Sequence, residues 1–395
     1  MTSSRTYAPY DPLDPSHQAA PGPRLAEARR RCPVSEPRPG EFVIARHADV
    51  SAAVTDHEAF SSRNNFVLDG GTETADLPAA PITAMDPPEH TALRARLRRW
   101  FAPAQLRKQE PRIREIVDEL IDQLPRGQSV DLFTALGRRV PARTVYAFIG
   151  LPEADWDRLQ GWADVIDHQF PRVSIDMPEM AALAGYLGEL VAIRSTQPAT
   201  PDVLGGLIHA AGGETPLAPV EIVMDLMQLI LAGTDTTGAL ITNLLYELLV
   251  DRSRWERLLA DRTLILAAIE ESLRHDAPLQ YVLRTANDDR KICGCPVQAG
   301  NRLVLHLQSA NWDEEAWGDD ADAFSLDRPA GQATLMSFGY GIHTCLGAPL
   351  ARLEARIVLE RLLDRVPELR LCADYRRQPG PGLMVRRPAR LDVSL

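Results

Sequence analysis

The chain has 395 residues, 45% of them apolar, which is enough to bury a large hydrophobic core. Its 43 basic and 54 acidic residues give a formal net charge of −11, which argues against a nucleic-acid-binding protein. No apolar stretch is long enough to span a bilayer, and residues 1–15 lack a signal-peptide pattern. The five cysteines are irregularly spaced, so we expect free thiols in a cytoplasmic protein without a membrane anchor.

The N-terminal part of the chain is rich in proline. Residues 1–40 contain eight prolines and predict an irregular lead-in ahead of one domain over residues 41–395. A short strand is expected at residues 42–44, followed by a helix over residues 48–54. Residues 62–88 are rich in Gly, Asp, Pro and Thr without a sustained period, which predicts a long functional loop.

From residue 88 onward, apolar residues recur mostly at helical spacing. The longest helix is predicted from Pro219 to Val250, because Pro219 suits a first turn and an almost unbroken pattern follows. At 1.5 Å per residue it would extend roughly 45 Å and cross a whole domain. The sequence therefore predicts a mainly α single fold with small β pieces. Other helices are expected at 88–108, 110–124, 136–149, 153–169, 177–195, 202–211, 263–275 and 347–364, and strands at 281–285, 303–307 and near 383–385.

The strongest local pattern is residues 338–347, which read Phe-Gly-Tyr-Gly-Ile-His-Thr-Cys-Leu-Gly. Gly339 and Gly341 permit a tight loop with positive φ and leave backbone N–H groups free to approach a ligand. Cys345 stands at the start of a predicted helix, where exposed N–H groups and the helix dipole favour a thiolate. A lone cysteine is more often a buried structural residue, but a thiolate in such a glycine loop is a good ligand for a soft metal.

This decapeptide resembles the haem-ligand signature of the cytochrome P-450 family. The resemblance implies a single cytochrome P-450-type fold, with many helices around a buried haem b and small β-sheets. It also implies that Cys345 is the proximal thiolate ligand of the iron, with Phe338 and Gly339 beside the ring. Thiolate ligation pushes electron density onto the iron and favours cleavage of the O–O bond.

A second pattern lies inside the long predicted helix, where residues 232–237 read Ala-Gly-Thr-Asp-Thr-Thr. A glycine within a helix costs up to about 1 kcal/mol relative to alanine. Threonine hydroxyls compete for backbone carbonyls, so the segment predicts a bend or a groove, or alternatively a tolerated packing defect. Taken together with the signature at residues 338–347, this segment is similar to the family's oxygen-binding groove. The resemblance implies that Ala232 and Gly233 lie against the haem, that Asp235 feeds protons and that Thr236 holds dioxygen and water.

Glu271 and Arg274 are three residues apart, so they share one helix face and can form an ion pair. Such a pair is usually a surface salt bridge worth a fraction of a kcal/mol. Here its position between the two motifs matches the family's structural Glu-x-x-Arg element. The family often has arginine where this chain has Ala323, which leaves the third member of the usual cluster open, with Arg328 as a candidate.

Four basic side chains are candidates to bind the haem carboxylates. His90 and Arg94 are four residues apart on one predicted helix face, Arg284 lies in a predicted strand, and His343 comes two residues before Cys345. Each alone is more often a solvated or core polar residue. All four match positions from which bacterial members of the family bind the two propionates, and charge-assisted contacts suit that task.

The stretch 94–114 is strongly basic within an acidic protein. Such a run is as often a solvated helix face as a docking surface. The resemblance places it near the thiolate side of the haem, where it would dock an acidic electron carrier, and the expected donor is a ferredoxin with its reductase. Its basic residues are Arg94, Arg96, Arg98, Arg99, Arg107, Lys108, Arg112 and Arg114.

The resemblance carried by these motifs implies a soluble bacterial-type monooxygenase that activates O2 with two electrons and oxidises a mid-sized, mostly apolar molecule. A natural-product intermediate is the expected substrate class. One alternative keeps the haem fold but carries out oxidative coupling, desaturation or nitration. Another is a zinc-stabilised binding protein that uses Cys293, Cys295, His343 and Cys345. The zinc site lacks the common Cys-x-x-Cys spacing and gives no role to Phe338.

Overall fold

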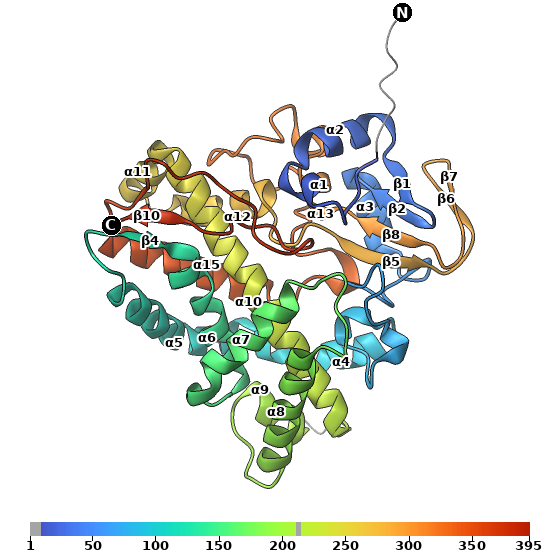
Figure 1. Cartoon of the computed structure of the whole chain (residues 1–395), viewed down its shortest axis with the longest axis horizontal. Coiled ribbons are helices and arrows are strands. Elements are labelled where there is room, and N and C mark those ends of the chain that lie inside the picture. The colour runs from blue at the N-terminus through green and yellow to red at the C-terminus, as the bar shows by residue number, and fades with distance from the viewer. Residues whose placement is uncertain (1–8, 211–214) are drawn as a thin grey trace, which may run out of the picture.

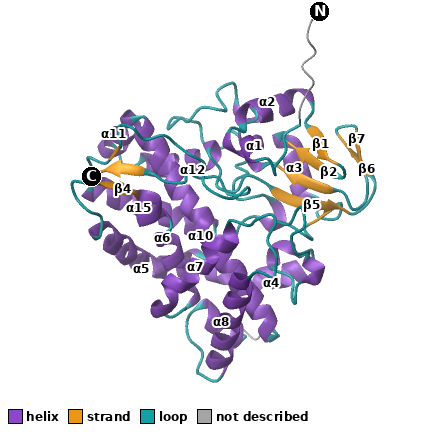
Figure 2. Cartoon of the chain, in the orientation of Figure 1, coloured by secondary structure: helices purple, strands orange, loops and turns teal. Residues whose placement is uncertain are grey.

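The computed structural model describes residues 9–210 and 215–395 of the chain. Helices fill most of the molecule, and the main sheet lies at one side of them (Figure 1, Figure 2). In these described ranges, no helix is long and apolar enough to cross a membrane. The prediction of a mainly α fold with small β pieces is confirmed.

The long helix α10 (Pro219–Val250) has the bounds that the sequence predicts and runs diagonally through the helical part (Figure 1). Pro219 occupies its first turn, and the Glu221 carboxylate caps that turn by accepting the N–H of Ala218 at 2.7 Å. The other longer helices are α2 (Gly22–Arg31), α3 (His47–Thr55), α4 (Glu89–Arg98), α5 (Pro103–Asp122), α6 (Arg139–Ile149), α7 (Trp156–Asp167), α8 (Pro178–Ser195), α9 (Val203–Ile208), α11 (Arg252–Ala260), α12 (Leu264–His275) and α15 (Ala348–Arg365), while α1 (Pro15–Ala19), α13 (Leu307–Asn311) and α14 (Glu314–Trp317) are short.

The main hydrophobic core lies between α5, α6, α10 and α15. Two glycines let α10 approach its neighbours closely. A Cβ on Gly238 would lie 2.5 Å from the carbonyl oxygen of Gly137, and a Cβ on Gly233 would lie 2.6 Å from a methyl carbon of Val145 on α6. The costly glycine in the middle of α10 is therefore explained by helix packing.

The main sheet has the strand order β1-β2-β8-β5-β3, in which β2 and β8 are parallel and the other neighbours are antiparallel. Its apolar side chains form a second core with α3 and α13. Its strands are β1 (Val34–Arg38), β2 (Glu41–Ile44), β3 (Phe60–Ser61), β5 (Val282–Ala286) and β8 (Arg302–Leu305); β4 (Ser129–Asp131), β9 (Arg370–Leu371) and β10 (Asp392–Ser394) form a second sheet, and β6 (Arg290–Ile292) and β7 (Cys295–Val297) form a hairpin.

The expectation of an irregular lead-in is wrong for residues 15–38, which form α1, α2 and β1. Pro15 occupies the first turn of α1, behind an Asp14 carboxylate that accepts the N–H of Ser16 at 2.8 Å. Pro23 likewise lies in the first turn of α2. A proline in the first turn costs no hydrogen bond, so these prolines begin helices instead of breaking them.

The predicted helices 88–108 and 110–124 differ from the structure at their junction. The chain leaves α4 through a short 3-10 turn, becomes extended at Ala102, and starts α5 at Pro103. Pro111, which the sequence placed near a helix boundary, lies inside α5. The long loop at 62–88 is confirmed, with only short 3-10 turns at Thr74–Asp76 and Ile82–Ala84.

Candidate active site

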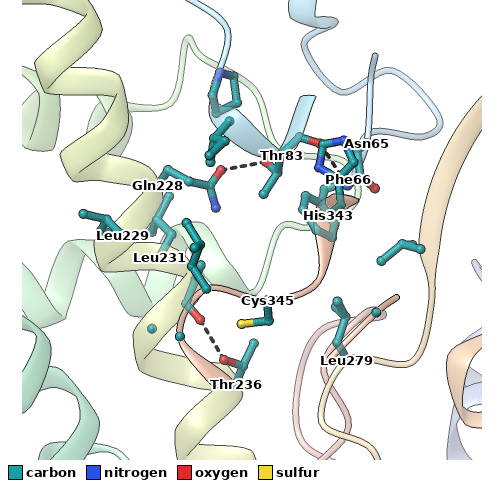
Figure 3. Close-up of a pocket in the computed structure, with 18 of the residues that line it drawn as sticks. Asn65, Phe66, Thr83, Gln228, Leu229, Leu231, Thr236, Leu279, His343 and Cys345 are labelled. Carbon is teal, nitrogen blue, oxygen red and sulfur yellow. Dashed lines mark hydrogen bonds between the residues drawn. The ribbon is translucent and has the colours of Figure 1, made fainter. Parts of the chain in front are cut away.

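A cavity of about 370 Å³ lies between α10, the 62–88 loop, β5 and the cysteine loop, as residues 338–347 are called below (Figure 3). The structure brings all of the predicted site residues to the lining of this one cavity. They are His90, Arg94, Ala232, Gly233, Asp235, Thr236, Arg284, Phe338, Gly339, His343 and Cys345.

The cysteine loop has the backbone that its glycines predict. Gly339 and Gly341 have φ values of +65° and +76°, which other residues rarely adopt. The loop is closed by a hydrogen bond from the Cys345 N–H to the Phe338 carbonyl at 2.8 Å. Phe338 also lines the cavity, and the guanidinium of Arg352 covers its ring at 4.5 Å. The loop thus fixes the thiol and the aromatic ring relative to each other.

Cys345 stands at the N-terminus of α15 with its side chain at the cavity (Figure 3). Burial raises the pKa of its thiol, and the N–H groups of Gly347 and Ala348 and the nearby Arg94 guanidinium oppose that rise. A coordinated metal ion deprotonates a thiol outright, so a bound cation would complete what these groups begin. The sulfur is therefore placed to act as a metal ligand.

The groove segment of α10 remains helical throughout. The hydroxyl of Thr236 donates to the carbonyl oxygen of Ala232 at 2.7 Å, as expected for a threonine that competes for a backbone acceptor (Figure 3). Ala232 and Thr236 line the cavity together. A side chain at position 233 would point toward Val145, so only glycine fits there. Gly233 therefore serves the packing of α10 against α6 in addition to lining the cavity.

The four predicted propionate ligands also meet at the cavity. The rings of His90 and His343 lie 4.0 Å apart, and His343 Nε2 contacts the hydroxyl of Ser62 at 2.9 Å. Arg94 donates to the Thr344 carbonyl at 2.5 Å, and Arg284, which is 2% exposed, donates to the Leu283 carbonyl at 2.8 Å.

These basic groups lack the partners that buried cations normally have. Within the described ranges, neither Arg94 nor Arg284 has an ion-pair partner, and both nitrogens of the buried His90 lack a hydrogen-bond partner. Burial lowers the pKa of Arg284 to about 10, against the opposing charge of Asp86. A bound dianion would satisfy these groups, so the residues present fit a haem whose two propionates they would hold.

The Glu-x-x-Arg element is a buried cluster and not a surface pair. Arg274 binds Glu271 through two hydrogen bonds of 2.8 Å, and their side chains are 1% and 4% exposed. Arg328 approaches the same carboxylate at 3.1 Å, and the Ala323 carbonyl accepts from both arginines. Arg328 therefore fills the place left open by the alanine at position 323.

The zinc alternative is not supported by the arrangement of its residues. Cys293 is exposed near the β6–β7 hairpin, where its thiol donates to Asp49, whereas His343 and Cys345 lie in the cysteine loop. Among the residues that the structure describes, no group of three or more His, Cys, Asp or Glu side chains could hold a metal ion.

Several features of the cavity have no counterpart in a local sequence motif. Asn65 links three segments of the cavity wall, because its amide donates to the Thr83 carbonyl and accepts the Leu283 N–H. The hydroxyl of Thr83 donates to Gln228 on α10 at 2.9 Å (Figure 3). Arg387 pairs with Asp235 from a point 152 residues further along the chain. Contacts between such distant residues carry no signal in a single sequence.

Comparison with known proteins decides the family. The model of the cytochrome P-450 family matches residues 194–369. The mycinamicin IV hydroxylase/epoxidase of Micromonospora griseorubida is 32% identical, and the match covers 100% of each chain. The erythromycin C-12 hydroxylase of Saccharopolyspora erythraea is 33% identical over 89% of each chain. The chain belongs to the cytochrome P-450 family.

Solved structures agree with this assignment. Cytochrome P-450 CREJ in complex with (4-ethylphenyl) dihydrogen phosphate has a TM-score of 0.88 and 28% identity, covering 98% of this chain and 100% of that chain. A mutant of P-450 EryK in complex with erythromycin B has a TM-score of 0.82 and 31% identity over 94% of each chain. As a cytochrome P-450, the protein is a haem monooxygenase that receives electrons from a redox partner and oxidises a small molecule.

Proposed function

We propose that Cys345 ligates the iron of a haem b and that this P-450 inserts oxygen into a mid-sized, mostly apolar natural-product intermediate. The observation that carries the proposal is the single cavity in which Cys345, at the start of α15, meets Asp235 and Thr236 of α10. When bound, a thiolate-ligated haem supplies the activation of dioxygen. His90, Arg94, Arg284 and His343 would hold its propionates.

The residues of α10 supply the groups that handle protons. Because the O–H group of Thr236 donates its hydrogen bond to the Ala232 carbonyl, the hydroxyl oxygen is left as an acceptor toward the cavity. Asp235, the preceding residue, also lines the cavity and supplies a titratable carboxyl. This pair would hold a water molecule in place and deliver protons to the oxygen site.

Replacing Thr236 with alanine tests this role. The Thr236→Ala variant should still fold and bind haem, because alanine is the better helix former and only one local hydrogen bond is lost. With the acceptor gone, a several-fold smaller share of the electrons should appear in product and the remainder in peroxide. The measurement is the amount of product and of peroxide formed per electron consumed. The control is Thr242→Ala, because the Thr242 hydroxyl also donates to a carbonyl of α10. Unchanged coupling in Thr236→Ala would remove this residue from the proton path.

The lining supports the proposed substrate class. It is mostly apolar, with Phe66, Leu229 and Leu279 among the side chains drawn in Figure 3. Besides Asp235 and Thr236, α10 contributes the polar side chains of Gln228 and Asp225 to the lining, and burial raises the pKa of Asp225 to about 7. Relatives named for mycinamicin and erythromycin hydroxylation support a natural-product substrate and favour oxygen insertion over coupling, desaturation or nitration.

We propose that the exposed part of the basic stretch 94–114 is a ferredoxin-docking surface. Arg112 and Arg114 are paired with glutamates, and Arg94 points inward to the Thr344 carbonyl. Arg98, by contrast, is exposed and lines a shallow cavity together with Cys345. The proposed docking surface is therefore the exposed part of the stretch, namely Arg98, Arg107 and Lys108, none of which has an ion-pair partner within residues 9–210 and 215–395.

Reversing two of these charges tests the docking surface. The Arg98→Glu/Lys108→Glu variant should bind a bacterial ferredoxin several-fold more weakly at low salt, and the difference should shrink at high salt because exposed charges are screened. The control is Arg30→Glu on α2, an exposed arginine far from α4 and α5 in Figure 1. Equal ferredoxin affinity for the double variant and the control would place the docking surface elsewhere. We also propose a cytoplasmic location, where ferredoxin reductases have their pyridine nucleotides and where the five cysteines, which form no disulfide, stay reduced.

A further inference from the structure

A charged cluster lies behind the groove segment of α10 (residues 232–237). It is formed between α7, α10 and the C-terminal segment, as the residues after β9 are called below. The Asp235 carboxylate accepts from Arg387 Nε at 2.9 Å, and the two side chains are 13% and 3% exposed. Arg387 lies 3.7 Å from the ring centre of Phe133, and its Nη2 contacts His168 Nε2 at 3.3 Å. Because an arginine only donates, His168 accepts here and is neutral. The acid proposed for proton delivery is thus held by a fixed arginine.

A second carboxyl stands beside this ion pair. Asp167, the last residue of α7, lines the cavity, and its Oδ2 accepts the hydroxyl of Thr234 at 3.3 Å. Thr234 directly precedes Asp235 on α10. The pKa of Asp167 is raised well above its ordinary value, mainly by burial and secondly by the negative charge of Asp235. The hydrogen bond from Thr234 and the positive charge of Arg387 oppose that rise.

The charges around Asp167 do not balance if every carboxyl is ionised. Asp164, one turn earlier on α7, has its own partner in Arg138. Arg387 is then the cation left for both Asp235 and Asp167, and two carboxylates that share one cation in a poorly solvated site retain a proton. The titratable groups that act on Asp167 are Asp164 from α7, Tyr146 from α6, Asp235 from α10 and Arg387 from the C-terminal segment. Arg138, just before α6, and His168, just after α7, act on its neighbours Asp164 and Asp235.

We propose that Asp167 is a proton reservoir for Asp235, and the inference rests on the proposed role of Asp235. In the resting state Asp167 is a neutral acid and Arg387 pairs with ionised Asp235. The O–H bond of Asp167 then breaks, the proton binds to an Asp235 oxygen, and Arg387 compensates the new charge on Asp167. The net charge of the three groups does not change, and no electron is transferred. Asp167 later regains a proton from solvent. Asp167 is a positioning residue, because it acts through Asp235 and not on the reacting atoms.

Infrared spectroscopy of the holoenzyme tests the protonation of Asp167. The wild-type protein at pH 7 should show the C=O stretching band of a neutral carboxylic acid, which shifts in D2O. This band should be lost in Asp167→Asn and kept in Asp164→Asn, whose carboxyl is ion-paired. Burial also raises the pKa values of Glu354 and Asp225, so the bands of these two carboxyls should remain in both variants. An Asp167→Asn spectrum identical to that of the wild type would overturn the proposal.

Proton supply is tested with the same variants and a ferredoxin and reductase as electron source. Asp167→Asn should keep its haem spectrum but consume oxygen several-fold more slowly, with a larger solvent isotope effect, and Asp167→Glu should recover both. A lost band with unchanged oxygen consumption and isotope effect would mean that Asp167 is only structural, and would overturn the reservoir. Absence of oxygen consumption in the wild type would instead overturn the proposed function, while the infrared band still decides the protonation of Asp167.

Discussion

Replacement of Cys345 with serine should abolish the haem-thiolate spectrum and the oxygenase activity. The serine hydroxyl keeps the size of the side chain, but it is not the soft, readily ionised ligand that iron receives from a thiolate. The glycine loop and the start of α15 do not depend on the sulfur, since the loop closes through the backbone contact between Cys345 and Phe338. The variant should therefore fold with the cavity intact. The measurement is the absorption spectrum of the reduced, carbon monoxide-bound protein.

Cys372→Ser is the matched control for this experiment. Cys372 is half-buried, lies in the chain just after β9, and has its thiol 3.4 Å from the hydroxyl of Ser129. This substitution should leave both the spectrum and the activity unchanged. An unchanged thiolate spectrum in Cys345→Ser would mean that another residue ligates the iron.

Replacement of Arg274 with methionine should cost about 3–5 kcal/mol of folding free energy, because it breaks a buried ion pair by removing one partner. Methionine fills similar space but leaves the Glu271 carboxylate with less charge compensation. It also removes the donor to the carbonyl oxygens of Asn311 and Ala323. Since whole domains are stable by only about 5–15 kcal/mol, the loss should show as a large drop in the urea midpoint and in haem retention.

Arg257→Met is the control for this prediction. Arg257 also binds a carboxylate through two hydrogen bonds, of 2.9 and 2.6 Å to Asp327, but the two side chains are 43% and 71% exposed. An exposed pair of this kind contributes about 0–1 kcal/mol. The free energies of unfolding of the two variants are then compared. If they differ by less than about 1 kcal/mol, the scale expected for exposed pairs, the buried cluster does not brace the haem pocket.

The parts of the site that the sequence predicts are those in which consecutive residues carry the information. Positive φ at Gly339 and Gly341, the thiol at a helix start, and the bounds of α10 all follow from local rules about glycine, helix termini and Pro219. The resemblance to the family then added the candidate partners of these motifs, and the structure brings those residues to the same cavity.

The parts that the sequence does not predict depend on contacts between distant segments. Arg387 reaches Asp235 only because the C-terminal segment returns to the residues just before β5, where Val385 bridges to Leu279. Asp167 ends an ordinary amphipathic helix, and nothing beside it in the chain indicates a carboxyl that faces α10. The N-terminal helices were missed for a different reason, because a proline has opposite effects in the first turn and in the middle of a helix.

The central claim is that Cys345 is the thiolate ligand of a haem bound in this cavity. The most direct test is the difference spectrum of the reduced wild-type protein with and without carbon monoxide. The account predicts the strongly red-shifted Soret band that distinguishes thiolate-ligated haem. A Soret band at the position typical of histidine-ligated haem, or a purified protein that takes up no haem, would contradict it.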